Sequence, residues 1–501
     1  MNPKAVVLIG LVSSIISFFP AGSQSDTIPL VSRTAGVLPQ GRLEGFLGVS
    51  GIKATKSLGV NDFAFAAKLG VGWVRMAVSW ADMNPAKGVY DWSSADKAVV
   101  NATAAGLKSV LMVRNTPAWA AVTTPYTFVT EGRGLDKGAT EFPSPQRWTV
   151  TPTLGASGLP NGYITRRETM SGTLITELKS SFPNLRMADP NVSWRPFMRE
   201  LVKRYSQAPY NVSFFQIANE HRPESGQYPE DSVESVAERW FVPAAQEAHK
   251  FAGVRVMNCW SSEVSNAQMD AFDAVPGVLE NLDIFGQHYG DFDRWRKVFN
   301  RYEAKGKPNI AYWATEYGDK PVDTFTWKVS HSYPAILGQV LARDWSYEDK
   351  FKLFWYPSKS SSNPYQSLAD ENGKPTAHGR QVQVLYSLLY GKTLELYPNF
   401  STIPDASTQD YSSGFRTDRG LVLAIGLLDT ANRPSRPNLT VTLPNLAVGA
   451  IKLARSVDAY GTIVERLNPQ TSGNGSRLTV DTTKLSDAGM QMIYLELQTT
   501  P

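Results

Sequence analysis

The sequence predicts a (β/α)8 barrel, the TIM-barrel fold, followed by a small β-sandwich. From residue 43 onwards, short runs rich in β-branched and aromatic residues alternate with segments of helical periodicity, as in βα units around a parallel sheet. After about residue 393 no long helical segment follows, and short β-rich runs are separated by turn-rich stretches. A chain of 501 residues is long enough for one large barrel and one smaller domain.

The first 23 residues are typical of a secretory signal peptide. Lys4 precedes an apolar run over 5–19 that is too short to cross a bilayer, and 20–23 supply small residues for a cleavage point. We therefore expect a secreted protein, extracellular or periplasmic, with no stable membrane insertion once 1–23 are removed. An uncleaved membrane anchor is the alternative.

Residues 37–393 are predicted to form the barrel. A doubly wound open sheet is the alternative, but it requires a glycine-rich phosphate-binding turn after the first strand, which Gly48-Val-Ser-Gly51 does not supply. Apolar residues recur every three or four positions over 192–205 and 231–252, which predicts two amphipathic helices. The eight candidate strands span 45–49, 73–78, 109–113, 212–218, 254–258, 284–288, 310–315 and 352–355.

Residues 120–190 are a long insertion, rich in Thr, Pro and Gly, between the third and fourth strands. A loop of this length inside a compact domain is usually functional or disordered. Because it follows a barrel strand, we expect it on the face where barrel active sites lie. Part of it, about 164–181, is expected to form an extra helix.

Residues 394–501 are predicted to form the β-sandwich. The chain has no internal repeat and no low-complexity linker, so the two domains are expected to pack closely. The candidate strands of the sandwich span 421–428, 439–443, 451–456, 477–480 and 492–497.

Composition and spacing exclude several classes of protein. The chain carries 50 Lys and Arg against 46 Asp and Glu, a net charge of +4, and has no basic run that indicates a nucleic-acid partner. A single cysteine, Cys259, excludes a disulfide scaffold and is predicted to pack in the core. The histidines lack the spacing of metal ligands, and no Gly-x-Ser-x-Gly motif marks a serine nucleophile. We expect neither a metal nor a cofactor.

Two predicted barrel strands end in glutamate. Asn219-Glu220-His221 follows the fourth strand, and Thr315-Glu316-Tyr317-Gly318 closes the seventh. Active-site residues of a barrel lie at the carboxyl ends of its strands, and a carboxylate buried there costs several kcal/mol unless a partner compensates. Paired carboxylates across a cleft suit hydrolysis of a glycosidic bond, where a separation of about 5–5.5 Å implies retention and about 6.5–9.5 Å implies inversion. A buried structural ion pair is the alternative.

These motifs resemble those of the clan A glycoside hydrolases, the retaining (β/α)8 enzymes. Asn-Glu after the fourth strand and Thr-Glu-Tyr-Gly after the seventh stand where the clan has its two acids, and the early barrel is similar to that of family 39 and related members. The likeness covers most of 45–390, and 395–501 in architecture only. The early-barrel motifs are Trp73-Val-Arg75, Trp80, Pro85-Ala-Lys-Gly88, Tyr90-Asp-Trp92, Asp96 and Thr116-Pro117-Ala-Trp119-Ala.

The resemblance implies roles for individual side chains. Glu220 would be the general acid/base and Glu316 the nucleophile, while Asn219 would hydrogen-bond the sugar 2-hydroxyl. Arg75 would hold Glu316 in its ionised form. The other expected contacts with the nucleophile or the sugar are those of His288 and Tyr289 after the sixth strand, Trp355 as an aromatic floor at the end of the eighth, and Trp119 directly after the third.

The activity that the resemblance implies is two-step, double-displacement hydrolysis of β-linked oligo- or polysaccharides. Two alternatives remain open: a transglycosidase that uses the same residues, and a non-hydrolytic carbohydrate-binding protein on a degenerate barrel. The sequence departs from the clan at two points. His221 stands where Pro often follows Asn-Glu, and Arg114-Asn115 stands where many members have His after the third strand.

Overall fold

The computed structural model describes most of the chain from residue 40 onwards. The predicted signal at 1–23 lies outside the described residues. The described ranges are 40–41, 43–130, 146–154, 160–169, 171–176, 181–182, 185–221, 230, 232–262, 264–289, 292–318, 337, 350–356, 359, 367–389, 394–397, 401–402, 413–418, 420–428, 438–443, 447–458, 463–465, 467, 469–473, 476–481 and 490–500.

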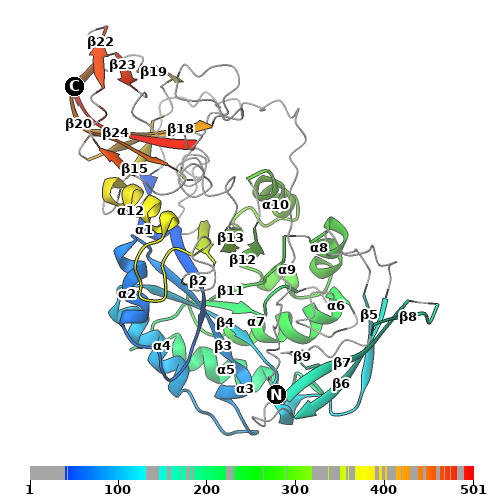
Figure 1. The fold of residues 1–501 in the computed structure, drawn as a ribbon. Helices are drawn as coiled ribbons and strands as arrows, with labels where there is room; N and C mark the ends of the chain where they lie inside the picture. Colours follow the sequence, from blue (N-terminus) through cyan, green and yellow to red (C-terminus); the bar gives the residue numbers. More distant parts are fainter. Residues whose placement is uncertain are drawn as a thin grey trace, which may run out of the picture.

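Eight parallel strands close into a barrel, which confirms the predicted fold (Figure 1). Each strand overlaps its predicted range, and β14 pairs with β2 to close the sheet. In chain order the barrel strands are β2 Leu47–Lys53, β3 Trp73–Ser79, β4 Lys108–Arg114, β10 Phe214–Ile217, β11 Arg255–Met257, β12 Ile284–His288, β13 Ala311–Tyr317 and β14 Phe351–Trp355.

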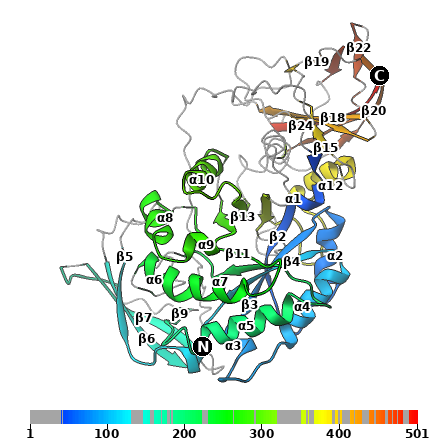
Figure 2. The ribbon, with the colours of Figure 1, turned by 180° about the vertical axis from the view of Figure 1, so that it is seen from behind.

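Helices surround the barrel on its outer side (Figures 1 and 2). The helix predicted over 192–205 is α5 (Trp194–Tyr205), and the one predicted over 231–252 is built from α6 (Val233–Val236), the π-helical segment Ala237–Phe241 and α7 (Val242–Ala248). The other described helices are α1 Leu43–Phe46, α2 Asn61–Lys68, α3 Trp80–Met83, α4 Ser93–Ala104, the 3-10 turn η1 Ala118–Ala120, α8 Asn266–Asp273, α9 Val278–Asn281, α10 Phe292–Ala304 and α12 Ala377–Leu389.

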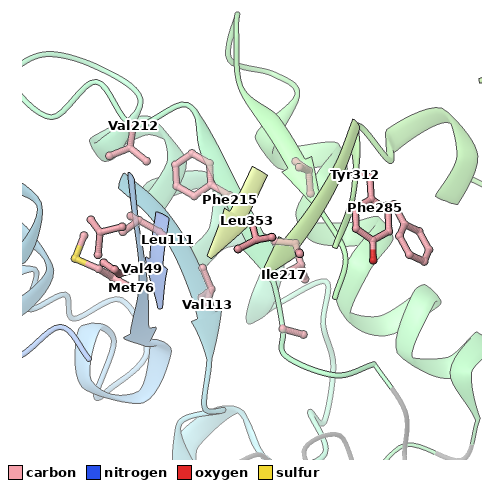
Figure 3. Packing of buried hydrophobic residues seen from close by; sticks show 14 of the residues in the cluster. Val49, Met76, Leu111, Val113, Val212, Phe215, Ile217, Phe285, Tyr312 and Leu353 are labelled. Carbon is pink, nitrogen blue, oxygen red and sulfur yellow. The ribbon is translucent and has the colours of Figure 1, made fainter. Parts of the chain in front are cut away.

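The barrel strands bury both of their faces, as a parallel sheet covered by helices requires. One set of alternating side chains packs in the outer layer between strands and helices, where Figure 3 shows Leu111, Phe215 and Leu353 among others. The other set fills the interior of the barrel, with Trp73 and Trp313 edge-on at 5.7 Å. The polar side chains described below lie towards the carboxyl ends of the strands, where barrel active sites form.

The insertion between β4 and α5 is an antiparallel sheet. Its strands are β5 Tyr126–Thr130, β6 Gln146–Leu154, β7 Pro160–Thr169, β8 Leu174–Thr176 and β9 Ser181–Phe182. The helix expected at about 164–181 is therefore wrong. In place of helical hydrogen bonds, β7 pairs with β6 on one side and with β8 and β9 on the other, so distant segments satisfy its backbone groups.

The predicted sandwich is present as two antiparallel sheets. Apolar side chains from both, such as Leu423 and Leu478, share one core. In both views, α12 lies between the barrel and these strands (Figures 1 and 2). The seven-stranded sheet runs β1 (Gln40–Gly41), β15 (Leu394–Leu396), β17 (Ser413–Thr417), β18 (Gly420–Leu428), β24 (Met490–Thr500), β20 (Ala447–Asp458) and β21 (Ile463–Glu465), and the four-stranded sheet runs β16 (Ser401–Thr402), β19 (Asn438–Thr442), β23 (Arg477–Asp481) and β22 (Gln470–Ser472).

The first and last parts of the described chain meet in the seven-stranded sheet. Gln40 and Gly41 pair with Glu395 and Leu394, so β1 extends the sheet that the C-terminal strands form. The segment before the barrel thus ties the barrel to the sandwich by backbone hydrogen bonds. Among the described residues, no helix is both long enough and apolar enough to span a bilayer.

Candidate active site

The backbone leaves regular strand geometry where the barrel strands end. Asn115 follows β4, Ala218 and Glu220 follow β10, and Tyr289 follows β12, and all four have positive φ angles between 51° and 70°. Non-glycine residues rarely adopt this conformation, and it costs free energy that the surrounding structure must supply. Such positions cluster at functional sites, and here they surround one end of the barrel.

Glu220 lies in a short turn that follows β10, and backbone hydrogen bonds hold this turn to the elements on either side of β10. The turn is tied to β4 by the Ala218 amide, which donates to the Val113 carbonyl at 3.1 Å. It is tied to the residues that follow β11 by the His221 amide, which donates to the Cys259 carbonyl at 2.8 Å. The Glu220 side chain keeps about a quarter of its surface exposed, at 24%.

Glu316 is turned into the barrel by one extra residue in β13. Ala311 and Trp313 lie in the barrel interior, so strict alternation would bring Thr315 there next and turn Glu316 outwards. The register of β13 against β12 and β14 shifts after Ala314, which is the signature of a β-bulge. The bulge brings the Glu316 carboxylate, 14% exposed, to the side chains inside the barrel mouth.

Arg75 in β3 is the buried cation of the site. Its guanidinium is 2% exposed, so it needs hydrogen-bond acceptors that replace water. The acceptors are Gln216 Oε1 at 2.7 Å from Nε, Ser50 Oγ at 2.8 Å from Nη1, Glu316 Oε1 at 2.9 Å from Nη1, and Asn219 Oδ1, which accepts from Nη2. Arg75 therefore joins Glu316 to Asn219, the neighbour of Glu220.

His288 contacts both glutamates through one ring nitrogen. Its Nδ1 lies 3.1 Å from Glu220 Oε1 and 3.5 Å from Glu316 Oε2. Its other nitrogen, Nε2, lies 3.2 Å from the sulfur of Cys259. The ring is almost completely buried, and the His288 amide donates to the Trp260 carbonyl at 2.8 Å, which holds the end of β12 against the residues that follow β11.

The charges around His288 favour its protonated ring. Burial on its own lowers the pKa of His288, but the neighbouring Cys259 and Glu316 raise it overall well above its ordinary value. Burial likewise raises the pKa of the Cys259 thiol, and the adjacent His288 ring outweighs it, so the pKa of Cys259 is lowered overall. Among the residues that the structure describes, no group of three His, Cys, Asp or Glu is arranged to hold a metal ion.

The aromatic side chains expected at the site differ in their exposure. Tyr289 is 40% exposed, and its amide donates to the Glu316 carbonyl at 2.7 Å. Trp355 is completely buried between Tyr317 and His378, so its ring has no face open to a sugar in this conformation. The next residue, Tyr356, is the partly exposed ring at the end of β14, where burial first and then the charge of Glu316 raise its pKa.

Trp119 lies in η1, after β4, and is half-buried. Its indole Nε1 donates to the Asn84 carbonyl at 2.8 Å, and its ring packs edge-on against Trp80 at 6.2 Å. These contacts run to α3 and the residue after it. The structure therefore brings six of the eight predicted residues together at one end of the barrel: Arg75, Asn219, Glu220, His288, Tyr289 and Glu316. The Trp355 ring packs against His378 of α12 instead, and Trp119 is anchored on Trp80 and Asn84.

Four further residues belong to the site although sequence reasoning did not select them. Ser50 and Gln216 accept hydrogen bonds from Arg75, and Cys259 contacts His288. Tyr356 lies close enough to Glu316 for the charge of Glu316 to raise the pKa of Tyr356. Ser50 and Gln216 are completely buried polar residues on strands that pair with or face β3. A polar residue at an inward-facing strand position is the signal that points to such partners.

The sequence matches one family model over part of its length. Residues 54–143 match the glycoside hydrolase family 42 model, described as β-galactosidase, and this segment contains Arg75 and Trp119. No curated protein matches the sequence. The family match supports the predicted enzyme class, a glycoside hydrolase.

Solved structures that resemble this chain share its fold along most of its length. A β-xylosidase from Caulobacter crescentus CB15 is 12% identical with a TM-score of 0.55, over 92% of this chain and 98% of the other. A GH30 endoxylanase from Clostridium papyrosolvens C71 is 11% identical with a TM-score of 0.54, over 92% and 98%. A family 39 glycoside hydrolase from Bacteroides cellulosilyticus WH2 is 14% identical with a TM-score of 0.52, over 91% and 81%. These matches confirm the fold.

Proposed function

We propose that this chain, whose barrel and early-barrel segment resemble those of glycoside hydrolases, is a retaining glycosidase that cleaves β-linked oligo- or polysaccharides. Glu316 is the nucleophile and Glu220 the general acid/base. The observation that carries the proposal is the contact of both carboxylates with Nδ1 of His288.

This shared contact limits how far apart the two acids stand. Nδ1 lies 3.1 Å from Glu220 Oε1 and 3.5 Å from Glu316 Oε2, so the sum of the two distances, about 6.6 Å, is an upper limit on the separation of these two oxygens. A bend at Nδ1 makes the separation shorter. Retaining enzymes have carboxyl groups about 5–5.5 Å apart, whereas inverting enzymes need about 6.5–9.5 Å to admit a water molecule. The geometry supports retention.

In the first step, Glu316 attacks the anomeric carbon while Glu220 donates its proton to the departing glycosidic oxygen. The bond to the leaving group breaks as the bond to the Glu316 oxygen forms. Arg75 pairs with Glu316 Oε1 at 2.9 Å, which leaves Oε2 on the His288 side. Asn219, whose Oδ1 is occupied by Arg75, presents its amide nitrogen for the sugar 2-hydroxyl.

In the second step, Glu220 takes a proton from water, which attacks the same anomeric carbon and releases Glu316. The proton that Glu220 gave in the first step is thereby restored. Two displacements at one carbon return the starting configuration, so the product keeps the β-anomer. Nδ1 of His288 faces both carboxylates, at 3.1 Å from Glu220 Oε1 and 3.5 Å from Glu316 Oε2.

The export of the enzyme is part of the proposal. Residues 1–23 have the composition of a secretory signal, and polysaccharide substrates are met outside the cytoplasm. The near balance of 50 basic and 46 acidic residues suits a neutral glycan, which needs no strong field to attract it.

The test is activity of the mature chain on a panel of β-linked aryl glycosides and polysaccharides, beside two variants. Glu316→Gln removes the nucleophile, and we expect it to lose many orders of magnitude in kcat on every substrate that the wild type cleaves. Glu200→Gln is the matched control, because Glu200 is a half-exposed residue of α5 that contacts Lys203. Normal hydrolysis by the Glu316→Gln variant contradicts the proposal.

A further inference from the structure

Cys259 follows β11 and is completely buried beside the proposed catalytic residues. Its sulfur lies 3.2 Å from His288 Nε2, 3.6 Å from Thr315 Oγ1 and 3.9 Å from Asn219 Oδ1. The predicted role of Cys259 was packing in the core, and it is indeed buried. Its polar contacts show, however, that the thiol belongs to the hydrogen-bond network around His288.

The contacts of His288 determine where its protons lie. A neutral imidazole has one N–H donor and one bare acceptor nitrogen. Nδ1 faces carboxylate oxygens of Glu220 and Glu316, which only accept when ionised, so Nδ1 is the nitrogen that carries a proton. Nε2 is then the acceptor of a neutral ring, and the Cys259 thiol is the donor within reach.

The same proton arrangement holds if the ring is charged. In an imidazolium, Nε2–H donates to a Cys259 thiolate, and Nδ1 keeps its proton towards the two glutamates. In both states one proton lies between the sulfur and Nε2, and the other points at the acids. Loss of the sulfur would leave Nε2 without this partner and would permit the other tautomer, in which a lone pair faces Glu220 and Glu316.

We propose that Cys259 is a positioning residue for the glycosidase reaction, which acts through His288 by keeping a proton on Nδ1 towards Glu220 and Glu316. The inference rests on the proposed function, because Glu220 and Glu316 are the proposed catalytic groups that the Nδ1 proton faces. Cys259 itself lies behind His288, with its sulfur on the far nitrogen of the ring. It thus contributes no contact with the sugar.

The test compares Cys259→Ala with Cys259→Ser in the full mature chain. Both side chains are smaller than cysteine, but only serine keeps a hydroxyl that donates to or accepts from Nε2. We expect Cys259→Ala to lose about 10- to 100-fold in kcat with little change in KM, the effect of one buried hydrogen bond. Cys259→Ser should recover most of this loss, although both variants lose similar packing.

Nitrogen-15 NMR of the histidine rings supplies the second readout. The Nδ1–H signal of His288, assigned with a His288→Gln variant, should persist in the wild type and in Cys259→Ser and should weaken or shift in Cys259→Ala. Equal kcat and the same ring signals in all three proteins overturn the inference. A loss of kcat that serine does not recover also overturns it, because packing would then explain the loss. Neither result touches the proposed function, whose own test is the Glu316→Gln variant.

Discussion

Arg75 Nη1 lies 2.9 Å from Glu316 Oε1, and this ion pair joins residues 241 positions apart in the chain. Both side chains are largely shielded from water, so the attraction is screened less than at a surface. Arg75 also donates to Ser50, Gln216 and Asn219. The guanidinium is therefore fixed independently of Glu316, and it holds the carboxylate in one place.

Arg75→Met should remove both charge balance and positioning. Loss of one partner leaves the other charge buried and unpaired, which typically costs about 3–5 kcal/mol of unfolding free energy. We expect kcat/KM to fall at least about 100-fold, equivalent to about 2.7 kcal/mol of transition-state stabilisation. Steady-state kinetics and urea unfolding measure the two effects.

The control for that variant is Arg204→Met. Arg204 forms a two-pronged ion pair with Asp96 on the outside of the barrel, through Nε and Nη2. The Arg204→Met variant should be less stable than the wild type but should keep an unchanged kcat. A fall in kcat of the same size in both variants would mean that the Arg75 effect is one of stability alone.

Glu220→Ala should separate the two steps of the reaction. Substrates with good leaving groups need little protonation, so their first step should remain fast and the glycosyl-enzyme should accumulate. Azide should then raise the rate, because it attacks the anomeric carbon without a general base, and the product should be a β-glycosyl azide. The absence of azide rescue on an activated aryl glycoside would contradict the role of Glu220.

Asn219→Ala should act through the sugar 2-hydroxyl. Because Arg75 occupies Asn219 Oδ1, the amide nitrogen is the group presented to that hydroxyl. We expect a loss of about 10- to 100-fold in kcat/KM on a full substrate, from one hydrogen bond strengthened in the transition state, and a much smaller loss on the matching 2-deoxy glycoside. Equal losses on both substrates would show that Asn219 acts only by holding Arg75.

His221 should make the protein less stable in acid. Burial lowers the pKa of His221 to about 3, so below its ordinary value of 6.5 the unfolded chain binds a proton that the folded protein does not. Stability therefore falls as the pH drops from about 6.5 towards 3, by about 2 kcal/mol at pH 5. In His221→Gln, urea unfolding at pH 7.5 and pH 5 should show a smaller difference between the two values.

His249 provides a control of opposite sign. Its hydrogen bond with Asp283, outweighing its burial, raises the pKa of His249. Its contribution to stability is thus fully present below about 6.5 and is lost as the pH rises through the raised pKa. His249→Gln should therefore lose more stability than the wild type between pH 7.5 and pH 5. The same response in both histidine variants would contradict these assignments.

The order of strands and helices was predictable from the sequence because each is a local pattern. The run at 311–317 is apolar and β-rich, and Glu316 could be placed at a strand end from that alone. The bulge after Ala314 could not be predicted, because it is a mismatch in length between β13 and its two neighbours. Because of that extra residue, the Glu316 side chain points into the barrel, where strict alternation would have turned it outwards.

Other features depend on contacts between distant parts of the chain, which a local sequence pattern does not record. The segment 164–181 is predicted to contain a helix, but β7 is stabilised by pairing with β6, β8 and β9. Trp355 stands at the predicted strand end, yet Tyr317 and His378 from other elements cover its ring. The role of Cys259 depends on a contact with His288, 29 residues away, that no local motif records.

The stereochemistry of hydrolysis tests the central claim most directly. Proton NMR should follow the anomeric signals of the sugar released from the best substrate of the panel. The enzyme concentration should be high enough for hydrolysis to be faster than mutarotation of the product. The account predicts that the β-anomer appears first and that the α-anomer grows in later by spontaneous equilibration. First appearance of the α-anomer would contradict the double displacement and the assignment of Glu316 as the nucleophile.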